Sequence, residues 1–214
     1  MQLLFISDHS DQGYPGTLSC TVTIELVADN RVLIEYEGIS DHPTFFNPTH
    51  HFYFNLSATA EPATAHELYL NAATIIATNA EYIPTGKRTP VENTAYDFRH
   101  HRIIGDQTFY NECYVLDKKK PKEVAAQLTD PSSGRSMTIT TTFPGIVFYT
   151  GDLLRSPFKK SQGICLETQF FPDAPNRPEF PSTRVEPGIK FNHTTQYQFT
   201  AALPDLVKGI DFIN

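Results

Sequence analysis

Cysteine is scarce in this sequence, and it has neither a long apolar run nor a leader segment. The three cysteines among 214 residues, Cys20, Cys113 and Cys165, are widely spaced and form no Cys-x-x-Cys pair. An odd, scattered set excludes the usual disulfide frameworks and zinc motifs and suits a reducing compartment. The first residues lack a basic segment before an apolar core, and no apolar run is long enough to span a bilayer. We therefore expect a cytoplasmic protein without a membrane span.

Positive charge is also in short supply. Lysine and arginine number 17 against 24 acidic residues, which gives a formal net charge of −7. Such a balance provides no electrostatic footprint for a phosphate backbone or an anionic membrane. The one basic run, residues 118–122, contains a proline and lies between two apolar segments, so we interpret it as a solvated loop. Neither nucleic acid nor a membrane is an expected partner.

Apolar residues that are present recur with the period of a β-strand in one segment after another. Residues 21–27 and 31–37 alternate on either side of Asp29 and Asn30, which predicts a β-hairpin. The other predicted strands are 52–56, 114–116, 137–143, 146–150, 164–170 and 195–201. Sixteen prolines and eleven glycines lie mostly between these runs, and no segment has a comparable helical period. With no repeat and no flexible linker, the pattern predicts an all-β protein, an antiparallel β-sandwich forming one domain over 1–214.

The segment 47–56 combines aromatic and polar residues in strict alternation. Its pattern puts His51, Tyr53 and Asn55 on one face and the apolar residues between them on the other. An imidazole, a phenol and an amide together suit a polyhydroxylated ligand, and a histidine can move a proton near neutral pH. An ordinary solvent-exposed strand face has the same alternation, so both interpretations stay open at this point.

Glu167 and Gln169 interrupt an otherwise apolar strand, 164–170, on one of its faces. Burial in a groove would raise the pKa of such a carboxyl toward the range that a general base needs. A salt bridge at the rim of the sheet with Arg177 or Arg184 is the structural alternative.

Metal binding is not expected at the histidine pairs. His50–His51 and His100–His101 are each adjacent in sequence, and neighbouring strand residues point to opposite faces. Neither pair therefore presents two ligands to one ion.

A series of short motifs runs in order along the chain. They are GYPGTL at 13–18, NPTHHFYFNL at 47–56, IPTG at 83–86, YDFR at 96–99, PG at 144–145, FYTG at 148–151, LETQ at 166–169, PDA at 172–174, Asn176, FP at 180–181 and PG at 187–188. The series resembles the aldose 1-epimerase (galactose mutarotase) family, in which 47–56 is similar to N-x-T-x-H-x-Y-F-N-L and 166–169 to L-E-x-Q. Each match is weak alone, but the ordered series is specific.

The resemblance implies a large antiparallel β-sandwich of the galactose mutarotase-like type that interconverts the α and β anomers of free aldohexoses such as glucose and galactose. It implies that Glu167 is the general base at the C1 hydroxyl and that His51 is the proton donor to the ring oxygen. Asn111 stands where the family has a sugar-binding aspartate. No cofactor and no metal are expected.

The chain departs from the family pattern in several places. The family's N-terminal portion, with an arginine in an N-R element and a histidine in an H-G-G element, has no counterpart, so a partner supplying that segment is an expectation. His50 replaces an asparagine, and Val147 a glutamine. A non-catalytic carbohydrate-binding module or an inactive fragment on the same fold is the alternative function. A hexose-phosphate epimerase is disfavoured because no cluster of arginines marks a phosphate pocket.

Overall fold

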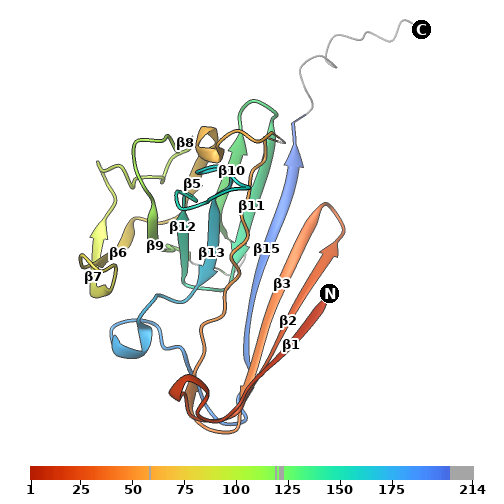
Figure 1. The fold of residues 1–214 in the computed structure, drawn as a ribbon, viewed down its shortest axis with the longest axis vertical. Helices are drawn as coiled ribbons and strands as arrows, with labels where there is room; N and C mark the ends of the chain where they lie inside the picture. The colour runs from red at the N-terminus through yellow and green to blue at the C-terminus, as the bar shows by residue number, and fades with distance from the viewer. Residues whose placement is uncertain (58, 119, 121–122, 203–214) are drawn as a thin grey trace, which may run out of the picture.

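The computed structural model describes residues 1–57, 59–118, 120 and 123–202, and the strands within them form antiparallel sheets (Figure 1). The larger sheet has the order β1 (Gln2–Ser7), β2 (Leu18–Val27), β3 (Arg31–Ser40), β15 (Phe191–Ala201), β11 (Arg135–Thr141), β10 (Val124–Asp130), β5 (Glu67–Leu70), β8 (Arg102–Ile103). The smaller has the order β13 (Cys165–Gln169), β12 (Gly145–Tyr149), β9 (Asn111–Val115), β6 (Thr74–Thr78), β7 (Pro84–Pro90). The pair β4 (Thr44–Phe45) with β14 (Arg184–Val185) and the short 3-10 turns η1 (Asp11–Gly13), η2 (Ala63–Ala65) and η3 (Ala174–Asn176) complete the elements. The predicted all-β fold is confirmed.

The core lies between the inner faces of the two sheets. Tyr36 and Ile139 from the larger sheet and Phe148 and Leu166 from the smaller sheet are at most 1% exposed. They belong to one continuous cluster of buried side chains. Each large apolar side chain removed from water in this way stabilises the fold by about 1.5–3 kcal/mol. The apolar residues that alternate along the strands thus form the inner faces of both sheets.

The predicted hairpin is confirmed and longer than expected. β2 and β3 pair from Leu18↔Ser40 to Val27↔Arg31. The connecting residues Asp29 and Asn30 have φ angles of 62° and 54°. Short polar side chains tolerate this left-handed region better than most residues, which is why this turn can close the hairpin.

The predicted strand at 52–56 is wrong. Only Phe54 makes a β-bridge, to Ile164, and the flanking backbone is irregular. Side chains occupy the neighbouring positions along β13: Thr49 donates to the carbonyl of Thr168 (3.1 Å), and Asn47 pairs with the backbone of Phe170. Because side-chain bonds replace a backbone ladder, the segment runs beside β13 without becoming a strand.

The strands β1 and β2 carry an apolar face that the smaller sheet does not cover. In Figure 1 the red and orange strands lie on the far side of β15 from that sheet. Leu4 and Ile6 of β1 lie exposed on the opposite face, whereas the register aligns Leu3 and Phe5 of β1 with β2 on the face that continues the core. We call this the β1–β2 apolar face; its residues are Leu3, Phe5, Val22, Ile24 and Leu26. Leu3, Phe5 and Leu26 are 51%, 60% and 78% exposed. Exposed apolar patches of this kind are typical of interaction surfaces.

The described residues include no helix long and apolar enough to cross a membrane. The basic run at 118–122 lies partly outside the described residues, so its prediction as a solvated loop is not tested.

Candidate active site

Glu167 lies in the middle of β13, at the edge of the smaller sheet. Its neighbours Leu166 and Thr168 are fully buried in the sandwich, so alternation turns Glu167 to the opposite face, together with Cys165 and Gln169. Glu167 is nevertheless only 8% exposed. A carboxylate in such a position is costly to ionise, which is the environment expected of a functional group.

His51 reaches Glu167 from the irregular segment beside β13. Its Nε2 lies 3.2 Å from Oε1 of Glu167, and its Nδ1 lies 3.4 Å from the Sγ of Cys165. The rings of Tyr53 and Tyr149 lie 5.1 and 6.1 Å from the imidazole. The arrangement is consistent when Nε2–H donates to an ionised Glu167 and the thiol of Cys165 donates to Nδ1. The two residues predicted from separate segments are thus brought into direct contact.

Burial sets the proton affinity of Glu167. Loss of hydration raises the pKa of this carboxyl above its ordinary value, and nearby His51 only partly opposes that shift. The rim salt-bridge interpretation is wrong, because Arg177 pairs with Asp173 (3.0 Å) and Arg184 with Glu186 (2.6 Å). A carboxyl with an elevated pKa is a stronger base than an ordinary carboxylate, and its contact with an imidazole places both groups for proton transfer.

Asn111 lies at the start of β9, on the same face of the sheet as the Glu167–His51 pair. The register aligns Asn111 with Tyr149, and Tyr149 with Cys165, so two strand spacings, about 10 Å, separate β9 from β13. The Asn111 residue is exposed, and Val147 lies between the two rows. The surface between Asn111 and Glu167 is therefore apolar at its centre and polar at its ends, which suits a pyranose ring.

His50 faces away from this surface. Its Nε2 contacts the hydroxyl of Tyr197 on β15, and its ring stacks on Phe52 at 4.4 Å. Burial lowers the pKa of His50 to about 4, so it is neutral at physiological pH. The expected opposition of the two adjacent histidines is confirmed.

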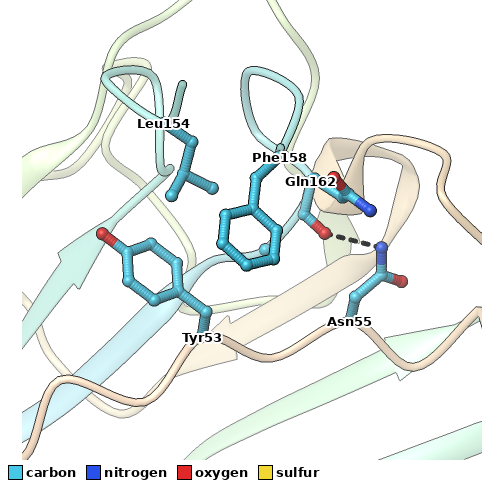
Figure 2. Close-up of a pocket in the computed structure, with 6 residues that line it drawn as sticks. Tyr53, Asn55, Leu154, Phe158 and Gln162 are labelled. Atoms are coloured by element: carbon cyan, nitrogen blue, oxygen red, sulfur yellow. Dashed lines mark hydrogen bonds between the residues drawn. The ribbon is translucent and has the colours of Figure 1, made fainter. Parts of the chain in front are cut away.

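The alternation predicted for 51–56 is confirmed only in part. Tyr53 and Asn55 line a pocket of about 250 Å³ with Leu154 and Phe158 (Figure 2), and the ring of Tyr53 also contacts His51. The Asn55 amide donates to the carbonyl oxygens of Gln162 (2.7 Å) and Glu61 (2.8 Å). Asn55 therefore links its own segment to the loops that contain these two residues. On the opposite side Leu56 is buried, but Phe52 is 40% exposed and outside the core.

Sequence reasoning missed Cys165 and Tyr149 as parts of the site. Cys165 precedes Glu167 by two residues, so strand alternation alone contained the signal that it shares the face of Glu167. Tyr149 required the strand register, which the sequence does not contain. The structure also brings His51, Cys165 and Glu167 together with potential ligand atoms within 4.8 Å of one another, the one such group among the described residues.

Two antiparallel sheets, with a carboxyl and an imidazole paired on the outer face of one of them, define a β-sandwich of the galactose mutarotase-like class. The aldose 1-epimerase family model matches residues 1–198, and this chain belongs to the aldose 1-epimerase family.

Relatives and solved structures agree with this assignment. The chain is 36% identical to galactose mutarotase of Homo sapiens and 33% identical to aldose 1-epimerase of Escherichia coli K12, in each case over 94% of this chain. The structure of an aldose epimerase homologue from C. elegans superposes with a TM-score of 0.88 at 25% identity, over 94% of this chain and 66% of that one. For galactose 1-epimerase from Lactobacillus acidophilus the TM-score is 0.81 at 26% identity, over 94% and 63%. The chain spans 63% of the human relative and 64% of the bacterial one.

Proposed function

We propose that this chain interconverts the α and β anomers of free aldohexoses such as glucose and galactose, with Glu167 as general base and His51 as proton donor. The observation that carries the proposal is the direct approach of the buried Glu167 carboxyl to His51, at 3.2 Å. The names of the relatives, galactose mutarotase and aldose 1-epimerase, support the same reaction. A module that only binds sugar has no need of a buried carboxyl with a raised pKa.

In the proposed mechanism the sugar enters between the two side chains and replaces their mutual contact. Glu167 removes the proton from the C1 hydroxyl while His51 gives a proton to the ring oxygen, and the C1–ring oxygen bond breaks. The aldehyde then turns about the C1–C2 bond, and the same two proton transfers in reverse close the ring on the other face. His51 lies on an irregular segment and is exposed, so it has room to move as the sugar binds.

Asn111 is the proposed contact for the hydroxyls at the far side of the ring. Its amide both donates and accepts hydrogen bonds, and its position across Tyr149 leaves about two strand spacings, roughly 10 Å, for the substrate. Contacts of this kind hold the reacting atoms near hydrogen-bond distance of both catalytic groups, which contributes to rate as well as to affinity.

A second polypeptide layer is part of the proposal. The β1–β2 apolar face is exposed, and the matched relatives are longer than the region that aligns with this chain. We expect a segment equivalent to the remaining part of those relatives to cover this face and to complete the sugar site. A cytoplasmic location remains our proposal from the scattered free cysteines.

Polarimetry of freshly dissolved α-glucose tests the proposed reaction. The chain should speed the decay of optical rotation in proportion to its concentration. A decay equal to that in buffer at every chain concentration would remove the catalytic assignment and leave the binding module.

A further inference from the structure

Cys165 lies next to the catalytic pair, although the proposed reaction does not use it. Its thiol is free, its Sγ contacts Nδ1 of His51 at 3.4 Å, and Tyr53 also contacts the sulfur. The potential ligand atoms of His51, Cys165 and Glu167 lie within 4.8 Å of one another. These groups come from a strand and from the segment running beside it, so the fold itself assembles them.

We propose that His51, Cys165 and Glu167 form a binding site for a divalent cation of the zinc class, and that the bound ion blocks anomer exchange by occupying the catalytic pair. The blocking effect rests on the proposed function, whereas the binding of the ion does not.

The chemistry of the three groups selects the class of ion. Thiolate, imidazole and carboxylate are ligands of zinc, whereas magnesium and calcium require oxygen ligands in larger number. Three protein ligands leave a fourth position for water, as in zinc sites that are open to solvent. Among the described residues, this group of three side chains therefore suits zinc, for which it provides three of four ligands, better than magnesium or calcium.

The three groups lie close enough to draw together around one ion. With metal bonds of about 2.0–2.3 Å, nitrogen, oxygen and sulfur ligands lie roughly 3.3–3.6 Å apart. The ligand atoms of the three residues lie within 4.8 Å of one another, so they must move closer on binding. The contacts of His51, 3.2 Å to Glu167 and 3.4 Å to Cys165, use different ring nitrogens, so the exposed imidazole must also turn to present one nitrogen to the shared ion. Cys165 and Glu167 both belong to β13 and share its outer face.

Binding must release a proton, because the thiolate rather than the thiol is the metal ligand. The S–H bond of Cys165 breaks, the sulfur–metal bond forms, and the proton leaves to solvent.

Titration of the purified full chain with Co²⁺ tests the site directly. A thiolate-to-cobalt charge-transfer band should grow to one equivalent, and Zn²⁺ should then displace it. Cys165→Ser should remove the band and weaken zinc binding more than about tenfold, since even outer-shell partners are worth 10- to 100-fold in metal affinity. Cys20→Ser, which changes another buried free thiol, should leave both unchanged. No band in the wild-type chain, or a band that persists in Cys165→Ser, would overturn the proposal.

The blocking effect is measured separately, as anomer exchange with saturating Zn²⁺ and then with a chelator. Exchange should fall to the buffer rate and recover on chelation. Exchange that continues while the cobalt-binding site is filled with zinc would overturn the block. If the metal-free chain shows no exchange but the cobalt band forms as described, the proposed function fails while the metal site stands.

Discussion

At the scale of single residues, the burial of Glu167 makes the free energy of unfolding depend on pH. Its folded-state pKa is raised above the ordinary value of 4.5. Folding therefore favours the protonated form, so its contribution is fully present below the ordinary pKa and is lost as pH rises through the folded pKa. Above the folded pKa, the nearly buried Glu167 carboxylate therefore lowers the free energy of unfolding.

Glu167→Gln should therefore raise the free energy of unfolding at pH 7 by about 1 kcal/mol, the size typical of single stabilising substitutions. The amide keeps the volume and can still accept from His51. Thermal unfolding at pH 7 and at pH 4 measures the effect, and the advantage of the variant should shrink at the lower pH. A wild-type chain that is more stable than the variant at pH 7 would contradict this account of the burial.

The two adjacent histidines should respond differently to the same substitution. His51→Asn removes the proposed proton donor, so exchange should fall to the buffer rate. His50→Asn should keep exchange, because His50 faces Tyr197, but it should cost about 1 kcal/mol for the lost hydrogen bond. Exchange rates and urea unfolding separate the two effects. Equal loss of exchange in both variants would show that the opposed orientation of the side chains is incorrect.

At the scale of elements, alternation in the sequence predicted most of the strands, but it did not show which alternating segments pair with a neighbouring strand. The strands around Ile139, Phe148 and Leu166 were predicted because their apolar period is clear. The segment 51–56 has the same period but makes only one bridge, from Phe54 to Ile164. The side chains of Asn47 and Thr49, just before it, bond the backbone of β13 and of Phe170 where a ladder would otherwise run. A two-residue apolar period indicates which side chains share a face. Whether the segment forms a backbone hydrogen-bond ladder depends on the strand beside it.

The candidate site divides in the same way. Glu167 and His51 were predicted from their motifs, and their contact required the segment 47–56 to lie along β13. The roles of Cys165 and Tyr149 depend on packing between segments, which no local pattern encodes. The division of strands into a larger and a smaller sheet likewise depends on register and was not predicted.

Asn55 holds the loop that contains Phe158 and Gln162, which line the pocket shown in Figure 2. Asn55→Asp keeps its shape and removes both donated hydrogen bonds, to Gln162 and Glu61. The free energy of unfolding should fall by about 2 kcal/mol, because two carbonyl oxygens lose partners and face a carboxylate. Urea unfolding checks the value. A change below 0.5 kcal/mol, the range of ordinary surface substitutions, would show that the loop is held by other contacts.

Asn111→Asp tests the proposed sugar contact on β9. Asn111 is exposed, so stability should change by less than about 0.5 kcal/mol. A carboxylate accepts stronger hydrogen bonds from sugar hydroxyls than an amide does, so galactose affinity should increase. Titration of galactose followed by NMR shift changes measures that affinity. Unchanged or weaker binding would place the sugar away from Asn111.

At the scale of the whole molecule, the β1–β2 apolar face is the proposed docking surface for a second polypeptide layer. Leu3 and Phe5 are more than half exposed on this face. We expect slow exchange by the isolated chain and faster exchange when it is mixed with the part of human galactose mutarotase that lies outside the matched region.

Phe5→Asp should abolish that gain and leave the unassisted rate unchanged, because Phe5 lies on β1, the edge strand of the larger sheet, whereas Glu167 lies on β13 of the smaller sheet. Gln2→Asp, on the same strand but on its opposite face, is the control and should keep the gain. Exchange rates with and without the added segment decide the matter. Turnover that the segment does not change would show that the exposed face is unrelated to activity.

The most direct test of the central claim is exchange NMR on the two anomers of galactose, with the wild-type chain and Glu167→Gln compared at equal concentrations and with unfolding curves recorded for both. The account predicts that the exchange rate rises linearly with wild-type concentration, and that the folded variant gives the rate of buffer alone. Equal acceleration by the two folded chains would contradict the assignment of Glu167 as the base that opens the sugar ring.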